Sequence, residues 1–213
     1  MCPGPTFDRV YTVLKGRLVA GEFAIGEHLE PAQLGEELFS SATPVRDVLH
    51  RLVGERLVEA PRNDGFRVPA PSEAELRGLY GWRNLLVGLA LKPPPALPGS
   101  LSPASCETKN PSTMSAVTAE DLFLSIARRS PHLELEAAIA SVSERLGMFG
   151  PAERRLLGDL ADETDLIQRS LVEQDWPVVR RAVAAFHHRR RRQVPALLET
   201  AWRIAHNRQI RPV

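Results

Sequence analysis

The sequence predicts a mostly α-helical protein whose first third also carries a small β-hairpin. Three observations lead to this fold class. Apolar residues recur at helical spacing through most of the chain, a compact two-helix unit lies within residues 31–55, and Asn63-Asp64-Gly65 separates two short alternating apolar runs. The order of helix, helix-turn-helix and hairpin predicts an N-terminal winged helix-turn-helix, followed by an all-α helical bundle.

Composition excludes several classes of protein. The 213 residues are 43% hydrophobic and 25% charged, which is ordinary for a folded chain. No apolar run reaches the roughly 18 residues of a membrane span. The first 25 residues carry charged side chains, so we expect a cytoplasmic protein without membrane contact. The two cysteines, Cys2 and Cys106, are too few for a disulfide framework.

The N-terminal elements follow from spacing and from the residues at their ends. An amphipathic helix is predicted over 6–20, with Thr6 as a candidate cap, and a short helix follows from Pro31. The next helix has Ser41 or Thr43 available as a cap. Its apolar stripe continues through Val45, Val48, Leu49, Leu52 and Val53.

The rest of the chain divides around a proline-rich stretch. Ser72 and Glu75 have the spacing of a capping box, so a helix should begin there. Further helices are predicted over 118–129, 132–149, 151–172 and 176–207, and Pro195 should kink or split the last one. We therefore expect four parts: a winged helix at 1–70, a connecting helix at 71–92, a Pro/Ser-rich linker at 93–117, and a helical effector-binding or dimerisation domain at 118–213.

Many landmarks in the first 91 residues occur in the order of a known family. They are Gly21-Glu22-Phe23, Gly26-Glu27-His28-Leu29, Leu34 to Leu38, Ser41-Ala42-Thr43-Pro44-Val45-Arg46, Leu49, Leu52 to Val58, and Gly65-Phe66-Arg67-Val68. On these residues the chain resembles a GntR-family regulator of the FadR type with an FCD-like C-terminal domain. The resemblance implies that a recognition helix at about 43–55 enters the major groove of DNA and that the wing approaches the minor groove.

The resemblance also implies a set of DNA-binding residues, namely Ser41, Thr43, Pro44, Arg46, Arg51 and Gly65. Ser41 and Thr43 can donate to phosphate, and Arg46 can bind a phosphate or guanine. Residues 1–70 carry eight basic and ten acidic side chains, so binding must depend on a few placed groups. Ala42 stands where the family usually has a base-reading Arg, and Arg51, Arg62 and Arg67 are either compensating phosphate contacts or solvated surface residues.

The helical half resembles the FCD-type effector domain more loosely. Phe123, Thr164 and Phe186 stand where metal-binding members have histidines, so we expect no metal ion and no other cofactor. The implied effector site consists of Arg83, Phe123, Thr164 and Phe186. The two phenylalanines either line an apolar pocket or fill the core, and Arg83 either clamps a carboxylate or forms a surface salt bridge. His187 and His188, followed by Arg189 to Arg192, are expected to be solvated.

These expectations give one main function and one alternative. The main hypothesis is a homodimeric transcription regulator, more often a repressor in this family, that binds an inverted repeat in double-stranded DNA. It would be controlled by a small apolar or carboxylate-bearing effector. The alternative is a winged-helix dimer that has lost effector sensing and acts as an interaction or constitutive DNA-binding protein. No motif of a catalytic triad, phosphate loop or nucleotide site is present, so we do not expect an enzyme.

Overall fold

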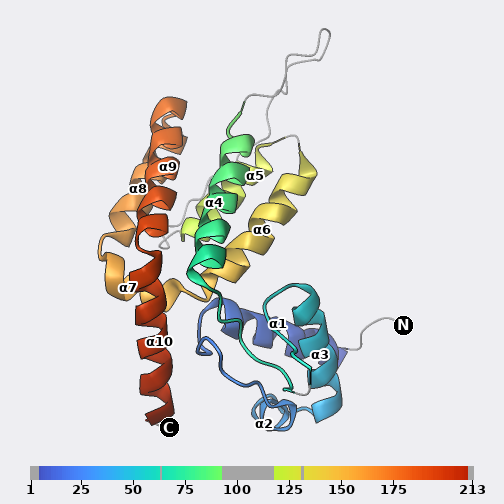
Figure 1. Cartoon of the computed structure of the whole chain (residues 1–213). Helices are drawn as coiled ribbons and strands as arrows, with labels where there is room; N and C mark the ends of the chain where they lie inside the picture. Colours follow the sequence, from blue (N-terminus) through green and yellow to red (C-terminus); the bar gives the residue numbers. More distant parts are fainter. Residues whose placement is uncertain (1–4, 63, 93–117, 131, 211–213) are drawn as a thin grey trace. The chain divides into compact units, whose positions relative to one another are not determined.

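Figure 1 shows the computed structural model of the chain, which describes residues 5–62, 64–92, 118–130 and 132–210. The described residues form ten α-helices in two compact units. Unit 1 comprises Met1–Arg77, Glu144–Gly158 and Gln193–Val213, and unit 2 comprises Gly78–Ser143 and Asp159–Arg192. The predicted linker at 93–117 and the hairpin residue Asn63 lie outside the described residues.

Unit 1 contains the three N-terminal helices α1 (Pro5–Val19), α2 (Pro31–Glu37) and α3 (Ala42–Gly54), which lie close to their predicted positions. Both α1 and α2 pack against α3. Thr6 is not a cap, because α1 begins one residue earlier. The buried apolar side chains are Val10, Leu14, Leu18, Leu34, Leu38, Val45, Val48, Leu49 and Leu52.

No β-strand is formed where the hairpin was predicted in the described residues, and only isolated antiparallel bridges occur there. Glu59 and Arg67 exchange both backbone hydrogen bonds, at 2.8 and 2.9 Å, and His28 forms a second bridge to Arg67. The Leu29 amide also donates to the Phe66 carbonyl at 2.8 Å. The wing is therefore a short, three-segment antiparallel pairing that is attached to the turn before α2.

The remaining helices of unit 1 are α7 (Gly150–Leu157) and α10 (Val194–Ile210), which pack against each other. The C-terminal end of α6 (Leu133–Gly147) also belongs to this unit. A Cβ atom on Gly147 would lie 2.7 Å from the Val19 carbonyl oxygen, so the backbones of α1 and α6 approach closely there. Lys15 of α1 forms an ion pair with Glu144 of α6 at 2.8 Å.

Unit 2 contains most of α4 (Glu73–Ala90), α5 (Ala119–Arg128), α8 (Leu160–Val172) and α9 (Trp176–Arg192). The Ser72–Glu75 capping box is confirmed, because the Ser72 amide donates to the Glu75 carboxylate at 2.8 Å and the Glu75 amide donates back to the hydroxyl at 3.3 Å. Thr118 and Asp121 cap α5 in the same way. Helix α8 packs against both α9 and α5.

Two predicted helices are divided in the structure. The single helix expected over 151–172 was wrong, because Gly158 adopts a left-handed φ of 64° and separates α7 from α8. The helix expected over 176–207 is split between Arg192 and Val194, as the position of Pro195 suggested. Within the described part of the chain, no helix has the length and apolar character needed to cross a membrane.

Candidate nucleic-acid interface and helical pocket

The C-terminal half of α3 is attached to α1 by a cluster of polar contacts. The Tyr11 hydroxyl donates to Glu55 Oε1 at 2.8 Å, and Lys15 Nζ donates to Glu55 Oε2 at 2.9 Å. Arg51 donates from Nε to the same carboxylate at 3.2 Å, while its guanidinium lies 3.9 Å from the centre of the Tyr11 ring. The predicted DNA-binding residue Arg51 is thus held against its own protein.

Opposing electrostatic effects act on this cluster. Burial by itself would lower the pKa of Lys15, but hydrogen bonds to Glu144 and Glu55 raise that pKa well above its ordinary value. Burial would likewise raise the pKa of Glu55, but hydrogen bonds from Lys15 and Tyr11 lower it below 4.5. Both side chains are therefore charged at neutral pH, and the end of α3 is fixed by an ionised network.

The N-terminal half of α3 is exposed instead. Ser41 is the N-cap residue, but its side chain makes no capping hydrogen bond, so the first N–H groups of α3 have no side-chain acceptor. Thr43 and Arg46 are exposed, and Pro44 is half-buried at the first turn. No hydrogen bond or ion pair joins Arg46 to another residue that the structure describes. Hydroxyls, a guanidinium and a helix N-terminus are thus grouped at one end of α3, where they suit a phosphate backbone.

The wing adds a second exposed segment. Gly65 is exposed with a left-handed φ of 65°, a conformation that glycine adopts without steric cost. Arg67 forms ion pairs with Glu59 at 3.1 Å and with Asp64 at 3.5 Å, so it partly neutralises the carboxylate beside the wing glycine. The ring of Phe66 packs edge-on against His50 at 4.9 Å, which joins the wing to α3.

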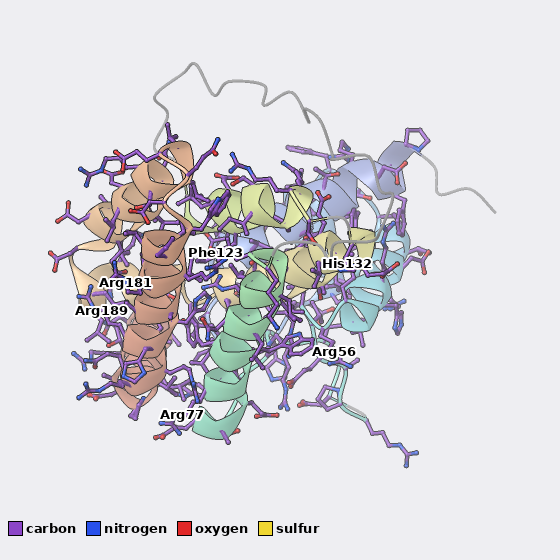
Figure 2. The ribbon with its side chains drawn as sticks, turned by 90° about the horizontal axis from the view of Figure 1, so that it is seen from above. Arg56, Arg77, Phe123, His132, Arg181 and Arg189 are labelled. Atoms are coloured by element: carbon purple, nitrogen blue, oxygen red, sulfur yellow. The ribbon has the colours of Figure 1, made fainter. Side chains whose placement is uncertain are left out.

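In unit 2, three of the four predicted effector residues, Arg83, Phe123 and Phe186, pack against one another. Arg83 of α4 is 1% exposed and donates from Nε to His187 Nε2 at 3.2 Å. Its guanidinium lies 4.8 Å from the ring centre of Phe123 and 3.6 Å from the Glu120 carboxylate. Phe123 lies among the helices of this unit, in edge-to-face contact with Phe186 at 5.2 Å (Figure 2). The burial of Arg83 contradicts the expected surface salt bridge, whereas its role as a clamp for a carboxylate effector stays a prediction.

Thr164, the fourth predicted effector residue, makes only local hydrogen bonds among the described residues. Its hydroxyl lies 2.8 Å from the Ala161 carbonyl and 3.1 Å from that of Leu160, both in α8. The neighbouring Glu163 carboxylate links α8 to α9, because it binds Arg189 and Arg190 at 2.9 and 2.8 Å.

His187 and Arg190 were predicted to be solvated, and this was wrong. His187 is fully buried, and Arg190 is 1% exposed with its guanidinium 3.2 Å from the Phe186 ring centre. Burial, with a smaller contribution from the charge of Arg83, lowers the pKa of His187 to about 3. The neutral ring is satisfied on both sides, since Nδ1 donates to the Val183 carbonyl at 2.8 Å and Nε2 accepts from Arg83.

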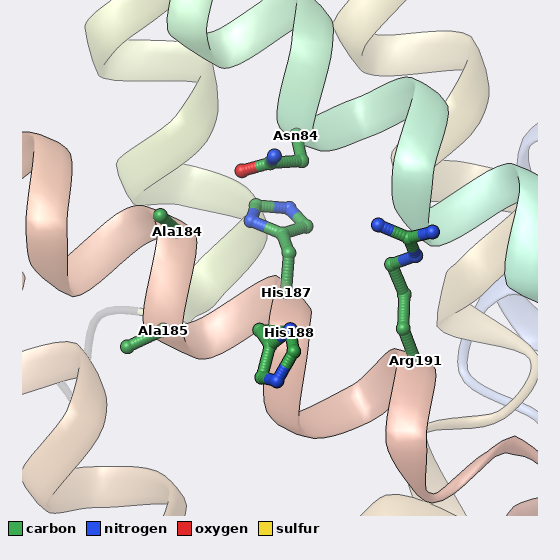
Figure 3. A pocket seen from close by; sticks show the side chains of 6 residues that line it. All are labelled: Asn84, Ala184, Ala185, His187, His188 and Arg191. Atoms are coloured by element: carbon green, nitrogen blue, oxygen red, sulfur yellow. The ribbon is translucent and has the colours of Figure 1, made fainter.

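A pocket of about 390 Å³ lies beside this buried cluster, between α4 and α9 (Figure 3). The residues that line it are Asn84, Ala184, Ala185, His187, His188 and Arg191. Asn84 extends from α4 toward His187, and Arg191 extends from α9 toward α4 (Figure 3). Small alanines and polar groups thus line the pocket together, whereas Arg83, Phe123 and Phe186 are enclosed in the core. Within the described ranges, no three His, Cys, Asp or Glu side chains are grouped as a metal site would require.

The three N-terminal helices and the bridged segments give residues 6–68 the fold of a winged helix. The same residues match the family described as bacterial regulatory proteins, gntR family. The N-terminal segment is thus similar to the regulatory proteins of the gntR family.

Two curated bacterial proteins match the N-terminal part of the chain. The HTH-type transcriptional repressor GlaR of Escherichia coli (strain K12) is 34% identical over 85 residues, which are 38% of this chain and 39% of GlaR. The uncharacterized HTH-type transcriptional regulator YdhC of Bacillus subtilis (strain 168) is 27% identical over 90 residues, 42% of this chain and 40% of YdhC. The matches thus cover about two fifths of the length of these relatives.

Solved structures extend the likeness to the whole fold. The structure of E. coli McbR/YncC superimposes with a TM-score of 0.61 at 20% identity, covering 94% of this chain and 100% of that one. A transcriptional regulator described as GntR from Rhodococcus sp. RHA1 gives a TM-score of 0.67 at 17% identity, covering 88% of this chain and 96% of that one. At this identity the likeness concerns the fold alone, a winged helix joined to a helical C-terminal part.

Proposed function

We propose that the protein is a sequence-specific DNA-binding regulator of transcription, acting in the cytoplasm as a repressor in the way that GlaR is named one. The observation that carries this proposal is the asymmetry of α3. Its last turns are bound to Tyr11 and Lys15, while its first turn presents exposed Ser41, Thr43 and Arg46. A helix that is fixed at one end and open at the other suits insertion of its N-terminal residues into the major groove.

The proposed contacts differ in what they contribute. Arg46 binds a guanine edge or a phosphate, whereas Ser41 and Thr43 bind phosphate oxygens beside the N-terminus of α3. Pro44 fixes the backbone of the first helical turn, and Gly65 lets the wing backbone approach DNA without a Cβ atom. Arg51 contributes a phosphate contact only by leaving the Tyr11 ring.

We also propose a homodimer that binds an inverted repeat, as the two-fold symmetry of such operators requires. An exposed apolar stripe on α4 supports a protein partner in unit 2. Trp82, Leu85 and Leu89 are 50%, 61% and 46% exposed at helical spacing. The FadR type and the FCD-like domain are part of the same proposal, and the helical architecture of unit 2 supports them.

The experiment that tests the main proposal is selection of bound duplexes from a random pool at fixed salt. The wild-type protein should enrich a palindrome, and Arg46→Ala should lose that enrichment. Arg181→Ala is the matched control, because Arg181 is also an exposed helical arginine but lies on the outer side of α9 (Figure 2). Salt-sensitive binding without any enriched sequence would contradict the proposal.

Effector control is a second proposal, and the pocket between α4 and α9 favours it. Arg191 and His188 stand beside an apolar floor of Ala184 and Ala185, which suits a small carboxylate-bearing molecule. A thermal-shift screen of small carboxylates should find a ligand that raises the melting temperature of the wild type and not of Arg191→Ala. Arg192→Ala is the control on the same helix. If no ligand stabilises the protein while it still selects a palindrome, the alternative of a constitutive DNA-binding dimer is correct.

A further inference from the structure

Phe39 has the most exposed large apolar side chain in the described residues. It lies in the turn between α2 and α3, and 92% of the residue is accessible to solvent. The turn leads directly into the exposed end of α3, whose N-cap position is Ser41, two residues after Phe39. A bare aromatic ring thus stands beside the polar groups that the proposed function assigns to DNA.

The backbone of Phe39 is also unfavourable for a residue with a side chain. Its φ is 50°, in the left-handed region that glycine adopts freely and that a Cβ atom makes costly. The conformation is held by its surroundings, because Arg9 donates to the Leu38 and Phe39 carbonyls at 2.8 and 3.3 Å. The Ser40 amide closes the turn on the Gly35 carbonyl at 2.8 Å.

Two separate costs therefore meet at one position, a left-handed backbone and an exposed ring. Glycine would remove both of them without disturbing the turn. Packing within the described part of the protein does not compensate for the ring, since it is almost fully accessible to solvent. An aromatic side chain at this position is therefore explained by favourable contacts that its ring makes only when the protein is bound to a partner.

The position of the turn indicates which complex this is. In a helix-turn-helix, the N-terminal residues of the second helix contact base edges, so a ring three residues before Ala42 stands at the edge of the major groove. The apolar group exposed in that groove is the C5-methyl group of thymine. Ala42 is also apolar, so this end of α3 offers methyl and ring contacts where a guanidinium would favour guanine.

We propose that Phe39 is a specificity-determining residue whose ring contacts a thymine methyl group in each half-site of the operator. The inference rests on the proposed function and deepens it, because it names the base that the turn recognises. Phe39 thus discriminates thymine from cytosine and from uracil at one position by apolar contact alone.

The test removes the methyl group without changing base pairing. Each thymine of the selected palindrome is replaced in turn by uracil, and the Kd is measured for wild type, Phe39→Gly and Phe39→Leu at one salt concentration. Loss of one buried methyl group should weaken wild-type binding about fourfold per half-site at one thymine position. Phe39→Gly should bind the thymine duplex at least that much more weakly and show no further loss with uracil at that position. Phe39→Leu should keep part of the discrimination.

Controls separate contact from folding. Circular dichroism should show Phe39→Gly folded with an unchanged or higher melting temperature, since glycine accepts the backbone conformation. Val172→Ala, which shortens an exposed apolar side chain of α8, should bind all duplexes like the wild type. The inference is overturned if Phe39→Gly keeps wild-type affinity, or if uracil weakens both proteins equally at every position. If no palindrome is selected at all, the proposed function fails and this inference fails with it.

Discussion

Helices α3 and α9 both carry arginines, but they use them in opposite ways. The first turns of α3 leave Arg46 exposed, whereas α9 turns Arg190 into the core beside the fully buried His187. In unit 1 the charged groups lie around an apolar core, whereas in unit 2 the two arginines Arg83 and Arg190 are part of the core. The comparison teaches that the charge of a residue does not decide its burial, and that the helical face on which it lies does.

The largest expected effect on stability concerns two adjacent arginines that bind the same carboxylate. Arg190→Ala should lower the free energy of unfolding by about 3 kcal/mol, because it removes a buried partner of Glu163 and the cation over the Phe186 ring. Arg189→Ala should cost less than about 1 kcal/mol, since that side chain is 36% exposed. Urea denaturation followed by circular dichroism measures both. Equal losses would show that burial does not separate the two residues.

The second test concerns the pH dependence of stability. The pKa of His187 in the folded protein is about 3, below the ordinary 6.5. Between these two pH values His187 is therefore protonated in the unfolded chain and neutral in the folded protein. Stability should therefore fall as pH decreases below 6.5, by about 2 kcal/mol between pH 7.5 and pH 5.0. His187→Gln should remove this part of the pH dependence, while His188→Gln, at an exposed position, should keep it. Urea denaturation at the two pH values gives the comparison, and equal slopes for all three proteins would contradict it.

A smaller effect is expected from backbone conformation, where two positions of unit 1, one arginine and one glycine, have a similar positive φ. Arg56 has a φ of 60° at the end of α3, and Gly158 has a φ of 64° before α8. Arg56→Gly should stabilise the protein by about 1 kcal/mol, and Gly158→Ala should destabilise it by a similar amount. Removal of Arg56 also relieves Arg145, whose pKa is lowered by burial and by the charge of Arg56. Thermal denaturation of both variants should give shifts of opposite sign.

The smallest effect on stability is expected at Arg46, the residue to which the largest role in DNA binding is assigned. Arg46→Ala should change the free energy of unfolding by less than about 0.5 kcal/mol, because the side chain is exposed. The same variant should lose selective DNA binding. A clear loss of stability, measured by urea denaturation, would mean that Arg46 supports the fold and would weaken its assignment to DNA.

The N-terminal elements were predictable because local signals and packing agree there. Pro31 and Pro44 mark helix starts, and the apolar stripe of α3 is regular, so the helix-turn-helix emerges from the sequence almost to the residue. The extent of the wing pairing was not predictable, since single bridges depend on the segment before α2. The break at Gly158 was missed because an isolated glycine is tolerated within a helical pattern.

The errors in unit 2 have a common cause. The run from His187 to Arg192 was interpreted by its charge, and a charged run is usually solvated. Its helical spacing carried the opposite signal, since the buried stripe of α9 proceeds through Val179, Val183, Phe186, His187 and Arg190. Arg83, Phe123 and Phe186 lie near one another, but their assignment to an effector stays a prediction, because sequence could not decide whether their side chains leave a cavity.

The close approach at Gly147 has a consequence for how this chain tolerates change. A Cβ atom there would meet the Val19 carbonyl oxygen at 2.7 Å and the Val19 side chain at 2.9 Å. Shortening Val19 would relieve only the second contact, because the first involves main-chain atoms that no substitution removes. In a saturation library, position 147 should therefore accept glycine alone, without a compensating partner, whereas at Gly158 only the positive φ disfavours other residues, because a Cβ atom there meets nothing within 4 Å. Replacement of α1 or α6 by another helix should succeed only where the close approach between positions 19 and 147 is kept.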